Sequence, residues 1–189
     1  TYVYEVKIAE KLKTMSKTEP ACLIKNSHIS SVLETTEFPY SKEQISAIST
    51  AFKEKVSIIT GGPGVGKTTI LKSIIEVIQR YSKDKTIISL ASPTGKAAKR
   101  MSESTKMEAK TIHRLIEYDP QSKSFKKNEY EEMDSKFYII DESSMVDLKL
   151  FYSLIMAIPN DAYLIIIGDA DQLPSVGYGS VLRDLINSE

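Results

Sequence analysis

The chain has 189 residues, and its 25 lysines and arginines balance 25 aspartates and glutamates. Zero net charge excludes binding to nucleic acid by bulk electrostatic attraction alone, so any such binding needs a local surface. One cysteine, Cys22, excludes a disulfide framework and a cysteine-based metal site, and no apolar run is long enough for a membrane helix. We therefore expect one full domain with a small appendage, located in the cytoplasm and without a membrane partner.

The N-terminal region predicts a helical appendage. Apolar residues recur on one face of residues 1–16, with lysines around it, which is typical of an amphipathic helix with a solvated face. Residues 17–40 are polar and mixed, and we expect His28, which has no partner in the sequence pattern, to be exposed. So short a region cannot bury a core of its own. We interpret residues 1–37 as the end of a larger N-terminal helical region and residues 38–189 as the main domain.

A helix is predicted from Ser41 to about residue 54. Ser41 and Gln44 fit a capping box, in which two side chains satisfy free backbone N–H groups at the start of the helix. Gln44 has a second interpretation, because an amide that donates and accepts hydrogen bonds can recognise the adenine of a nucleotide. The residues alone favour neither interpretation.

The most specific signal is the segment 61–69, Gly-Gly-Pro-Gly-Val-Gly-Lys-Thr-Thr, which matches the phosphate-binding loop pattern. A buried strand over 56–60 and a helix over 67–81 give it the required context. Its glycines let backbone N–H groups converge on a phosphate at the positive end of the helix dipole. Lys67 is expected to reach the β- and γ-phosphates, and Thr68 to bind Mg²⁺. The predicted nucleotide-binding residues of this loop are Gly62, Gly64, Val65, Gly66, Lys67, Thr68 and Thr69.

A second buried strand is predicted over 86–91, followed by a polar loop and a short helix that ends near Met101. Ligands bind at the carboxyl ends of strands in an open α/β sheet, so polar and basic residues here can contact a phosphate backbone. The alternative is a solvated basic helix face. The residues concerned are Thr94, Lys96, Lys99 and Arg100.

Residues 111–116 predict a short helical turn, and the polar segment that follows, 117–136, predicts either a projecting β-hairpin or a loop. A third apolar strand over 137–140 then ends in Asp141 and Glu142. Nucleotide-hydrolysing domains have a carboxylate that binds Mg²⁺ at the end of such a buried strand. Asp141 would therefore hold the ion, and Glu142 would orient or deprotonate a water. The alternative is an acidic pair favoured by a helix dipole.

A fourth apolar strand over 163–167 leads to Gln172, and helices are predicted over 148–158 and 179–187. Gln172 is either a sensor of the γ-phosphate or a plain polar turn residue, and its position alone does not decide between the two. Four apolar strands that alternate with helices predict the α/β class, with a parallel sheet covered by helices on both faces.

Together these motifs resemble the first half of a superfamily 1 DNA helicase. The stretch Pro174-Ser175-Val176-Gly177 is most similar to the RecD family, which comprises the alpha subunit of exodeoxyribonuclease V and its stand-alone relatives. The resemblance covers residues 38–187 with the motifs in order, and it implies a RecA-like P-loop NTPase domain. The matching segments are Gln44, 61–69, 91–101, 111–115, 141–145 and 168–177.

The resemblance also implies individual roles. Gln44 would recognise adenine, and Thr68 and Asp141 would bind Mg²⁺. Glu142 would be the catalytic base, and Gln172 would couple the γ-phosphate to DNA. The implied catalytic residues are Lys67, Glu142 and Gln172. The implied contacts to single-stranded DNA are Pro93, Thr94, Lys96 and His113. A strand-separating hairpin insertion would occupy residues 116–136.

Helicases of this family have two RecA-like domains with ATP between them, and the second supplies an arginine to the γ-phosphate. The arginines of this chain are Arg80, Arg100, Arg114 and Arg183, and none lies in a motif similar to that finger. We therefore interpret the chain as the first motor domain of a 5′-to-3′ DNA helicase, nearly inactive by itself, with ATP and Mg²⁺ as cofactors.

The partners implied by the resemblance are single-stranded DNA, the second RecA-like domain of the same parent chain, and RecB-like or RecC-like subunits. Two other interpretations stay open. One is a nucleotide-dependent switch that contacts a partner without translocating, which the net neutrality favours. The other is a related helicase linked to a conjugative relaxase.

Overall fold

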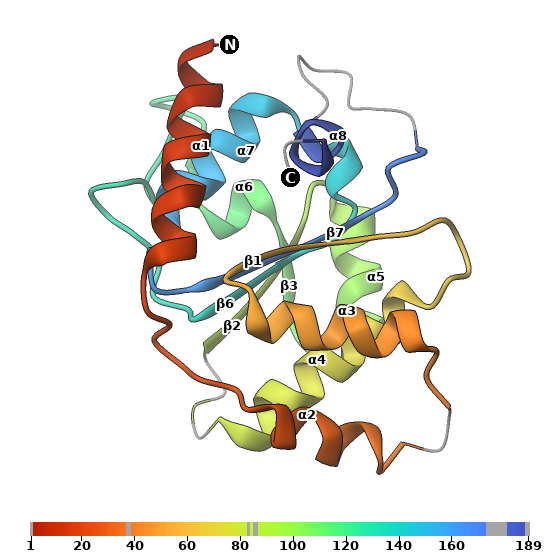
Figure 1. Cartoon of the computed structure of the whole chain (residues 1–189). Helices are drawn as coiled ribbons and strands as arrows, with labels where there is room; N and C mark the ends of the chain where they lie inside the picture. The colour runs from red at the N-terminus through yellow and green to blue at the C-terminus, as the bar shows by residue number, and fades with distance from the viewer. Residues whose placement is uncertain (1, 37–38, 83, 85–86, 173–180, 188–189) are drawn as a thin grey trace.

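The computed structural model describes residues 2–36, 39–82, 84, 87–172 and 181–187. At its centre is a five-stranded sheet in the order β1-β7-β6-β2-β3, in which all neighbouring strands run parallel (Figure 1). The strands are β1 (Val56–Thr60), β2 (Ile88–Ser92), β3 (Ala109–Thr111), β6 (Phe137–Ile140) and β7 (Tyr163–Gly168).

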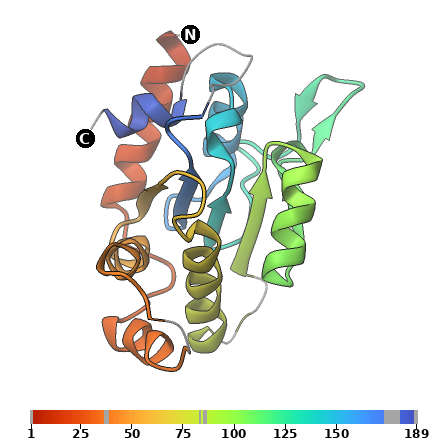
Figure 2. The same cartoon turned by 90° about the vertical axis from the view of Figure 1, so that its right-hand side faces the viewer.

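Helices cover both faces of this sheet, as Figures 1 and 2 show. One face carries α1 (Tyr2–Lys17), α6 (Ile112–Leu115), α7 (Leu148–Ala157) and α8 (Val181–Ile186). The other carries α2 (Asn26–Leu33), α3 (Lys42–Lys53) and α4 (Lys67–Tyr81), with α5 (Gly95–Thr105) beside α4. The predicted α/β fold, a parallel sheet with helices on both faces, is confirmed.

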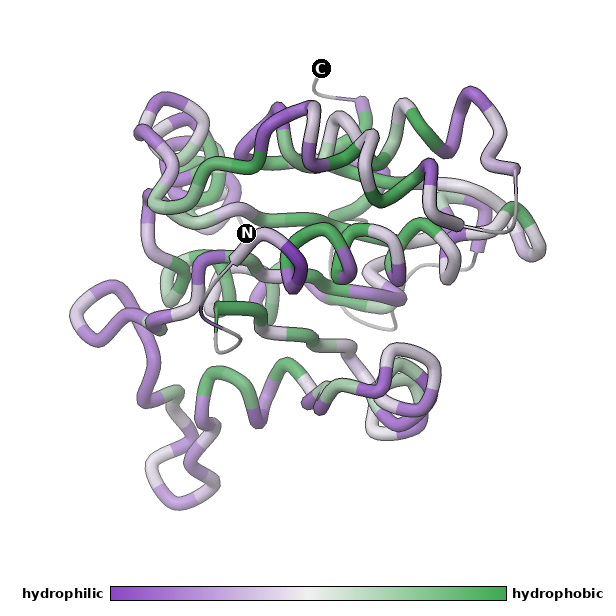
Figure 3. Tube along the Cα trace, turned by 90° about the horizontal axis from the view of Figure 1, so that it is seen from below, coloured by the Kyte–Doolittle hydropathy of each residue, from purple (hydrophilic) through white to green (hydrophobic). Residues whose placement is uncertain are grey.

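The central strands are apolar throughout because both of their faces are covered. Along β6, Tyr138 and Ile140 pack into the cluster under α1 and α7, while Phe137 and Ile139 pack into the cluster under α3 and α4. All four side chains are buried. Figure 3 shows the same pattern, with apolar segments through the middle of the molecule and hydrophilic segments on its projecting loops.

The sequence pattern predicts four strands, but the sheet has five. The fifth, β3, is an edge strand of three half-buried residues, Ala109–Thr111, and it pairs with β2 from Leu90↔Ala109 to Ser92↔Thr111. So short a polar segment leaves no apolar run to detect. Its place in the sheet comes from tertiary pairing with β2, not from local propensity.

The N-terminal helix α1 packs on α7 and contributes Ile8 and Met15 to the same apolar cluster. One of its lysines, Lys11, pairs with Glu132 at 3.2 Å, so the helix face predicted as solvated is partly engaged. The prediction that His28 is exposed was wrong. Its half-buried ring stacks on Tyr81 with ring centres 4.1 Å apart.

A small antiparallel hairpin follows α6, formed by β4 (Tyr118–Asp119) and β5 (Ser124–Phe125). The Asp119 carboxylate closes its turn by accepting hydrogen bonds from the Gln121 N–H at 3.0 Å and the Ser122 hydroxyl at 2.8 Å. The hairpin projects from the body of the domain, away from the central sheet (Figure 2). Of the helices that the structure describes, none is long and apolar enough to cross a membrane.

Candidate active site

The candidate residues gather at one edge of the sheet because all five strands point the same way. The phosphate loop follows β1, Asp141 and Glu142 follow β6, and Gln172 follows β7. The residues predicted to touch DNA follow β2 and β3, on the other half of the same edge. Parallel pairing thus brings together motifs that are more than a hundred residues apart in sequence.

The phosphate loop needs its glycines for two different reasons. Gly64 and Gly66 have φ angles of 82° and 85°, in the left-handed region that side chains disfavour. A Cβ atom on Gly66 would also lie 2.3 Å from Nε2 of Gln44, whereas a Cβ on Gly62 would meet nothing within 4 Å. The open space at Gly62 and Gly64 is what a backbone cradle for a phosphate requires. The Lys67 ammonium donates to the carbonyl of Gly61.

Gln44 engages both the start of its helix and the phosphate loop. Its backbone N–H donates to the Ser41 hydroxyl at 3.2 Å and its Oε1 accepts from the Ser41 N–H at 3.0 Å, so the predicted capping box is confirmed. Its Nε2 donates to the carbonyl of Val65 at 3.3 Å. The amide therefore connects α3 to the loop, next to Gly66.

Thr68, Asp141 and Glu142 line one cavity of about 150 Å³ with residues of α5. Burial raises the pKa of Asp141 above its ordinary value, while the Glu142 N–H, which donates to it at 2.8 Å, and Lys67 lower that pKa. A hydroxyl and a carboxylate on adjoining elements are hard oxygen donors, and Mg²⁺ commonly uses one or two such protein ligands together with phosphates and waters. The residues present therefore fit a nucleotide-bound Mg²⁺.

Glu142 sits in a left-handed backbone conformation with φ of 55°, at the start of a short 3₁₀ helix, η2 (Ser143–Met145). The loop is fixed from the other side by Ser143, whose hydroxyl donates to the carbonyl of Ile167 in β7 at 2.7 Å. A Cβ on Gly168 would lie 2.5 Å from that hydroxyl oxygen, so glycine is required where the loop crosses β7.

Gln172 lies beside this loop. Its Oε1 accepts a long hydrogen bond of 3.5 Å from the Ser144 hydroxyl, and its N–H donates to the carbonyl of Asp169 at 3.3 Å. The structure thus brings Gln172 to the segment that follows Glu142. Residues 173–180, which contain the stretch Pro174–Gly177 singled out above, lie outside the described residues.

The predicted DNA contacts lie at the ends of β2 and β3, which are neighbours in the sheet. The pairing Ser92↔Thr111 places the segment from Pro93 to Lys96 beside His113. The Thr94 hydroxyl accepts from the Ala97 N–H at 3.2 Å and so caps α5, while the Lys96 side chain is exposed. His113 is exposed, with its ring centre 5.6 Å from that of Tyr118.

Arg100 was predicted as one of a set of phosphate-backbone contacts, and that role stays a prediction. It lines the cavity that contains Thr68, Asp141 and Glu142. A helical stripe in the sequence could have indicated this, because the residues of α5 that face the cavity recur at helical spacing. These residues are Ala97, Arg100, Met101 and Ser104.

Comparisons with known proteins agree with the observed fold. The family model described as AAA domain matches residues 44–178. The ATP-dependent RecD2 DNA helicase of Deinococcus radiodurans is 35% identical over 181 residues, covering 96% of this chain and 24% of that protein. The RecBCD enzyme subunit RecD of Mycobacterium tuberculosis is 36% identical, covering 77% of this chain and 28% of that protein. The chain thus spans about a quarter of the length of these curated relatives.

Among solved structures, the Pif1 helicase from Candida albicans has a similar fold, with a TM-score of 0.55 and 24% identity over 74% of this chain and 34% of that chain. The matched family model shows that the chain belongs to the AAA domain family, and its similarity to the RecD2 and RecD proteins makes it a RecD-like superfamily 1 helicase motor domain.

Proposed function

We propose that this domain binds ATP with Mg²⁺ and serves as the first motor domain of a 5′-to-3′ DNA helicase. One observation carries the proposal. The phosphate loop, Asp141 and Glu142 lie on the same sheet edge as the segments around Thr94 and His113. One half of that edge carries the predicted nucleotide-binding residues, and the other half carries the predicted DNA contacts. The relatives named as helicases support this use of the edge.

In this proposal, different residues of the chain have different roles at the nucleotide. Lys67 leaves the Gly61 carbonyl and binds the β- and γ-phosphates, and the left-handed glycines present backbone N–H groups to them. Thr68 and Asp141 hold Mg²⁺, which neutralises phosphate charge when it is bound. Glu142 accepts a proton from the attacking water, and Gln172 senses the γ-phosphate. Gln44 recognises the adenine.

A direct route connects the two halves of the edge. The Asp141 N–H donates to the carbonyl of Ala91 at 2.9 Å, so the loop that carries the acid is bonded to the strand that leads into the DNA-side segment. A change at the nucleotide that moves Asp141 would therefore pull on β2 next to Pro93 and Thr94. We propose this contact as one link between hydrolysis and movement on DNA.

A nucleotide-dependent switch is the second candidate function. Zero net charge favours it. In that case nucleotide would change a partner contact without translocation. The second RecA-like domain, and RecB-like or RecC-like subunits, are proposed partners in the helicase function, as the name of the tuberculosis relative suggests.

The deciding experiment measures ATP hydrolysis by the longest natural protein that contains this chain, with and without single-stranded DNA. The helicase proposal expects DNA to stimulate turnover and expects unwinding of a duplex with a 5′ overhang. Turnover that DNA does not change would favour the switch. For the domain itself we expect weak binding to single strands with a shallow salt dependence, because few phosphates are neutralised. A steep salt slope or a preference for duplex would contradict that expectation.

A further inference from the structure

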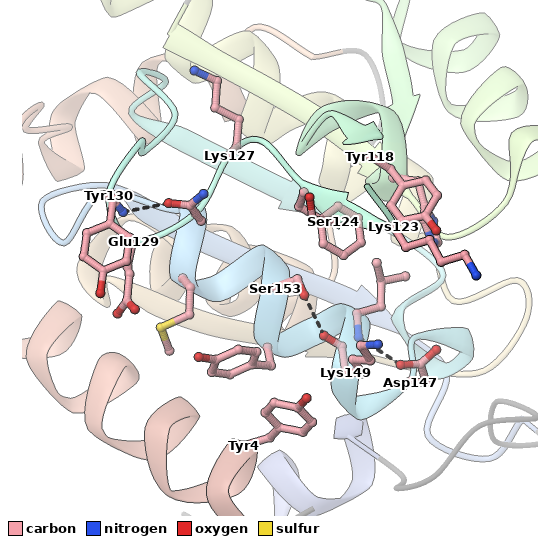
Figure 4. A pocket seen from close by; sticks show the side chains of 16 residues that line it. Tyr4, Tyr118, Lys123, Ser124, Lys127, Glu129, Tyr130, Asp147, Lys149 and Ser153 are labelled. Atoms are coloured by element: carbon pink, nitrogen blue, oxygen red, sulfur yellow. Dashed lines mark hydrogen bonds between the residues drawn. The ribbon is translucent and has the colours of Figure 1, made fainter. Parts of the chain in front are cut away.

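One cavity of the described residues lies away from the phosphate loop. It is an open groove of about 660 Å³ between the hairpin, the segment that follows it, α7 and the start of α1 (Figure 4). Its volume is in the range of about 300–1,000 Å³ that ligand sites occupy. His113 at the DNA-facing edge also lines it, so the groove begins where the proposed DNA contacts end.

Aromatic rings line this groove in two groups. At one end His113, Tyr118 and Phe125 form a cluster with ring centres 5.2 to 5.8 Å apart. At the other end Tyr4 of α1 and Tyr152 of α7 pack with ring centres 4.7 Å apart. A fully buried cluster would be ordinary core, but Tyr118 is 40% exposed and therefore presents part of its ring to solvent.

One further ring lies on the rim of the groove. Tyr130 is 92% exposed, the highest value among the large apolar side chains of the described residues. Its backbone is nevertheless fixed, because its N–H donates to the side chain of Asn128 at 2.9 Å. A ring that is so exposed contributes little to the stability of the domain, and it is suited to stacking on a flat partner.

Charges of both signs line the groove, and two of its lysines have no acidic partner among the described residues. Lys123 and Lys149 line it, and neither forms an ion pair with a described residue. A third lysine, Lys127, is paired with Glu131 at 3.0 Å. The two acids of the lining are Glu129 and Asp147, and the Asp147 carboxylate is occupied in capping α7, where it accepts from the Leu150 N–H at 2.9 Å.

We infer that this groove binds a single strand of DNA, with bases stacked on Tyr130 and Tyr118 and phosphates near Lys123 and Lys149. Aromatic platforms among basic side chains are the chemistry by which proteins hold single strands without sequence preference. The inference rests on the proposed function, because it continues the DNA path from His113 over the outer side of the hairpin. The groove would then guide a strand past the point where two strands part.

The absence of tryptophan from the chain permits a direct test. Tyr130→Trp introduces a single indole at the rim of the groove, and Tyr2→Trp introduces one at a position of α1 that is 76% exposed and does not line the groove. Titration with oligothymidylate should quench the fluorescence of the Tyr130→Trp protein to saturation, because bases stack on the indole. The fluorescence of the Tyr2→Trp protein should stay constant. Equal responses from the two proteins would overturn the inference.

A second measurement uses fluorescence anisotropy of labelled oligothymidylate. Tyr130→Ala and Lys149→Ala should each weaken binding, the tyrosine change by about fivefold or more, since one stacked base contributes about 1 kcal/mol or more. Lys72→Ala is the matched control, because that exposed lysine lies on α4 on the opposite face of the sheet.

These outcomes separate the groove from the proposed function. Wild-type binding that the two groove variants leave unchanged would overturn the groove as a DNA site and leave the helicase proposal standing. A wild-type domain that binds MgADP but no single strand would overturn the groove and the DNA contacts together. A domain that binds no MgADP would contradict the nucleotide site, whatever the groove does.

Discussion

The side-chain amide of Gln44 donates to the backbone carbonyl of Val65 at 3.3 Å, while its oxygen completes the capping box of α3. One residue therefore fixes both the start of a helix and the tip of the phosphate loop. The two roles can be separated by mutation, because Ser41 takes part in the cap and not in the loop.

Gln44→Ala should weaken MgADP binding by about tenfold and reduce the preference for adenine over guanine nucleotides. The physical reason is the loss of one hydrogen bond to the loop and of the proposed contact to the base, which together contribute about 1.4 kcal/mol. Ser41→Ala removes only the cap and should lower thermal stability by about 0.5–2 kcal/mol without changing nucleotide preference. Calorimetric titration with ADP and GDP checks both, and equal behaviour of the two variants would contradict the adenine role.

Lys67→Ala should weaken MgADP binding by about 10- to 100-fold, because a charge-assisted contact to a phosphate contributes about 1.5–3 kcal/mol. Lys72→Ala, an exposed lysine on the same helix, is the matched control and should bind as the wild type does. Isothermal titration calorimetry measures both. Unchanged affinity of the Lys67→Ala protein would refute the phosphate-loop assignment.

The raised pKa of Asp141 predicts how the stability of the domain depends on pH. Its folded-state pKa lies above the ordinary value of 3.8 because burial disfavours the charge. The folded state therefore holds this proton more tightly than the unfolded state, and stability from this group is lost as pH rises through the raised pKa. Asp141→Asn should raise the melting temperature at neutral pH without nucleotide and abolish the further rise that MgADP gives to the wild type. A lower melting temperature of this variant in the absence of ligand would contradict the prediction.

Arg100 and Lys96 lie one helical turn apart on α5 and should affect different ligands. Arg100→Ala should weaken MgADP binding by about tenfold, because its side chain shares the cavity of Thr68 and Asp141. Lys96→Ala should leave nucleotide binding intact and reduce the salt slope of single-strand binding by about 0.7, the value for one lost phosphate contact. If Lys96→Ala weakened MgADP binding and Arg100→Ala reduced the salt slope instead, the cavity would have been assigned to the wrong ligand.

The 189-residue domain alone should have almost no ATPase turnover, even with single-stranded DNA. An arginine finger contributes about 10³–10⁵ in turnover by offsetting charge on the transferred phosphoryl group, and the family's helicases take it from the second domain. A site open to water on one side also loses electrostatic stabilisation. A steady-state phosphate-release assay measures this. DNA-stimulated turnover of about 1 s⁻¹ or more would contradict it, and Glu142→Gln in the longer protein should abolish turnover while preserving ATP binding.

Features of the fold with strong local signals could be predicted from the sequence. The strands around Ile58 and Ile165 are continuous apolar runs, and the phosphate loop has a fixed spacing that only a strand, loop and helix can satisfy. The capping box of Ser41 and Gln44 was equally local. In each case the residues that determine the structure are neighbours along the chain.

Features that depend on distant partners could not be predicted. Strand β3 exists because β2 offers it hydrogen bonds, and the stacking of His28 on Tyr81 joins segments that are far apart in sequence. The position of Arg100 depends on how α5 lies against α4, which determines which face of the helix meets Thr68. Periodicity limits the possible faces, but packing selects one of them.

The backbone of Glu142 has a consequence for how this protein can change over time. A glutamate held at φ of 55° costs about 1–2 kcal/mol relative to a residue without a side chain, so glycine would make the apo domain more stable. A laboratory library selected for thermal tolerance alone should therefore drift towards glycine or asparagine at this position. A library of the longer protein selected for ATP turnover should keep the acid. The residue found most often at position 142 would then show whether the selection favoured thermal stability or ATP turnover.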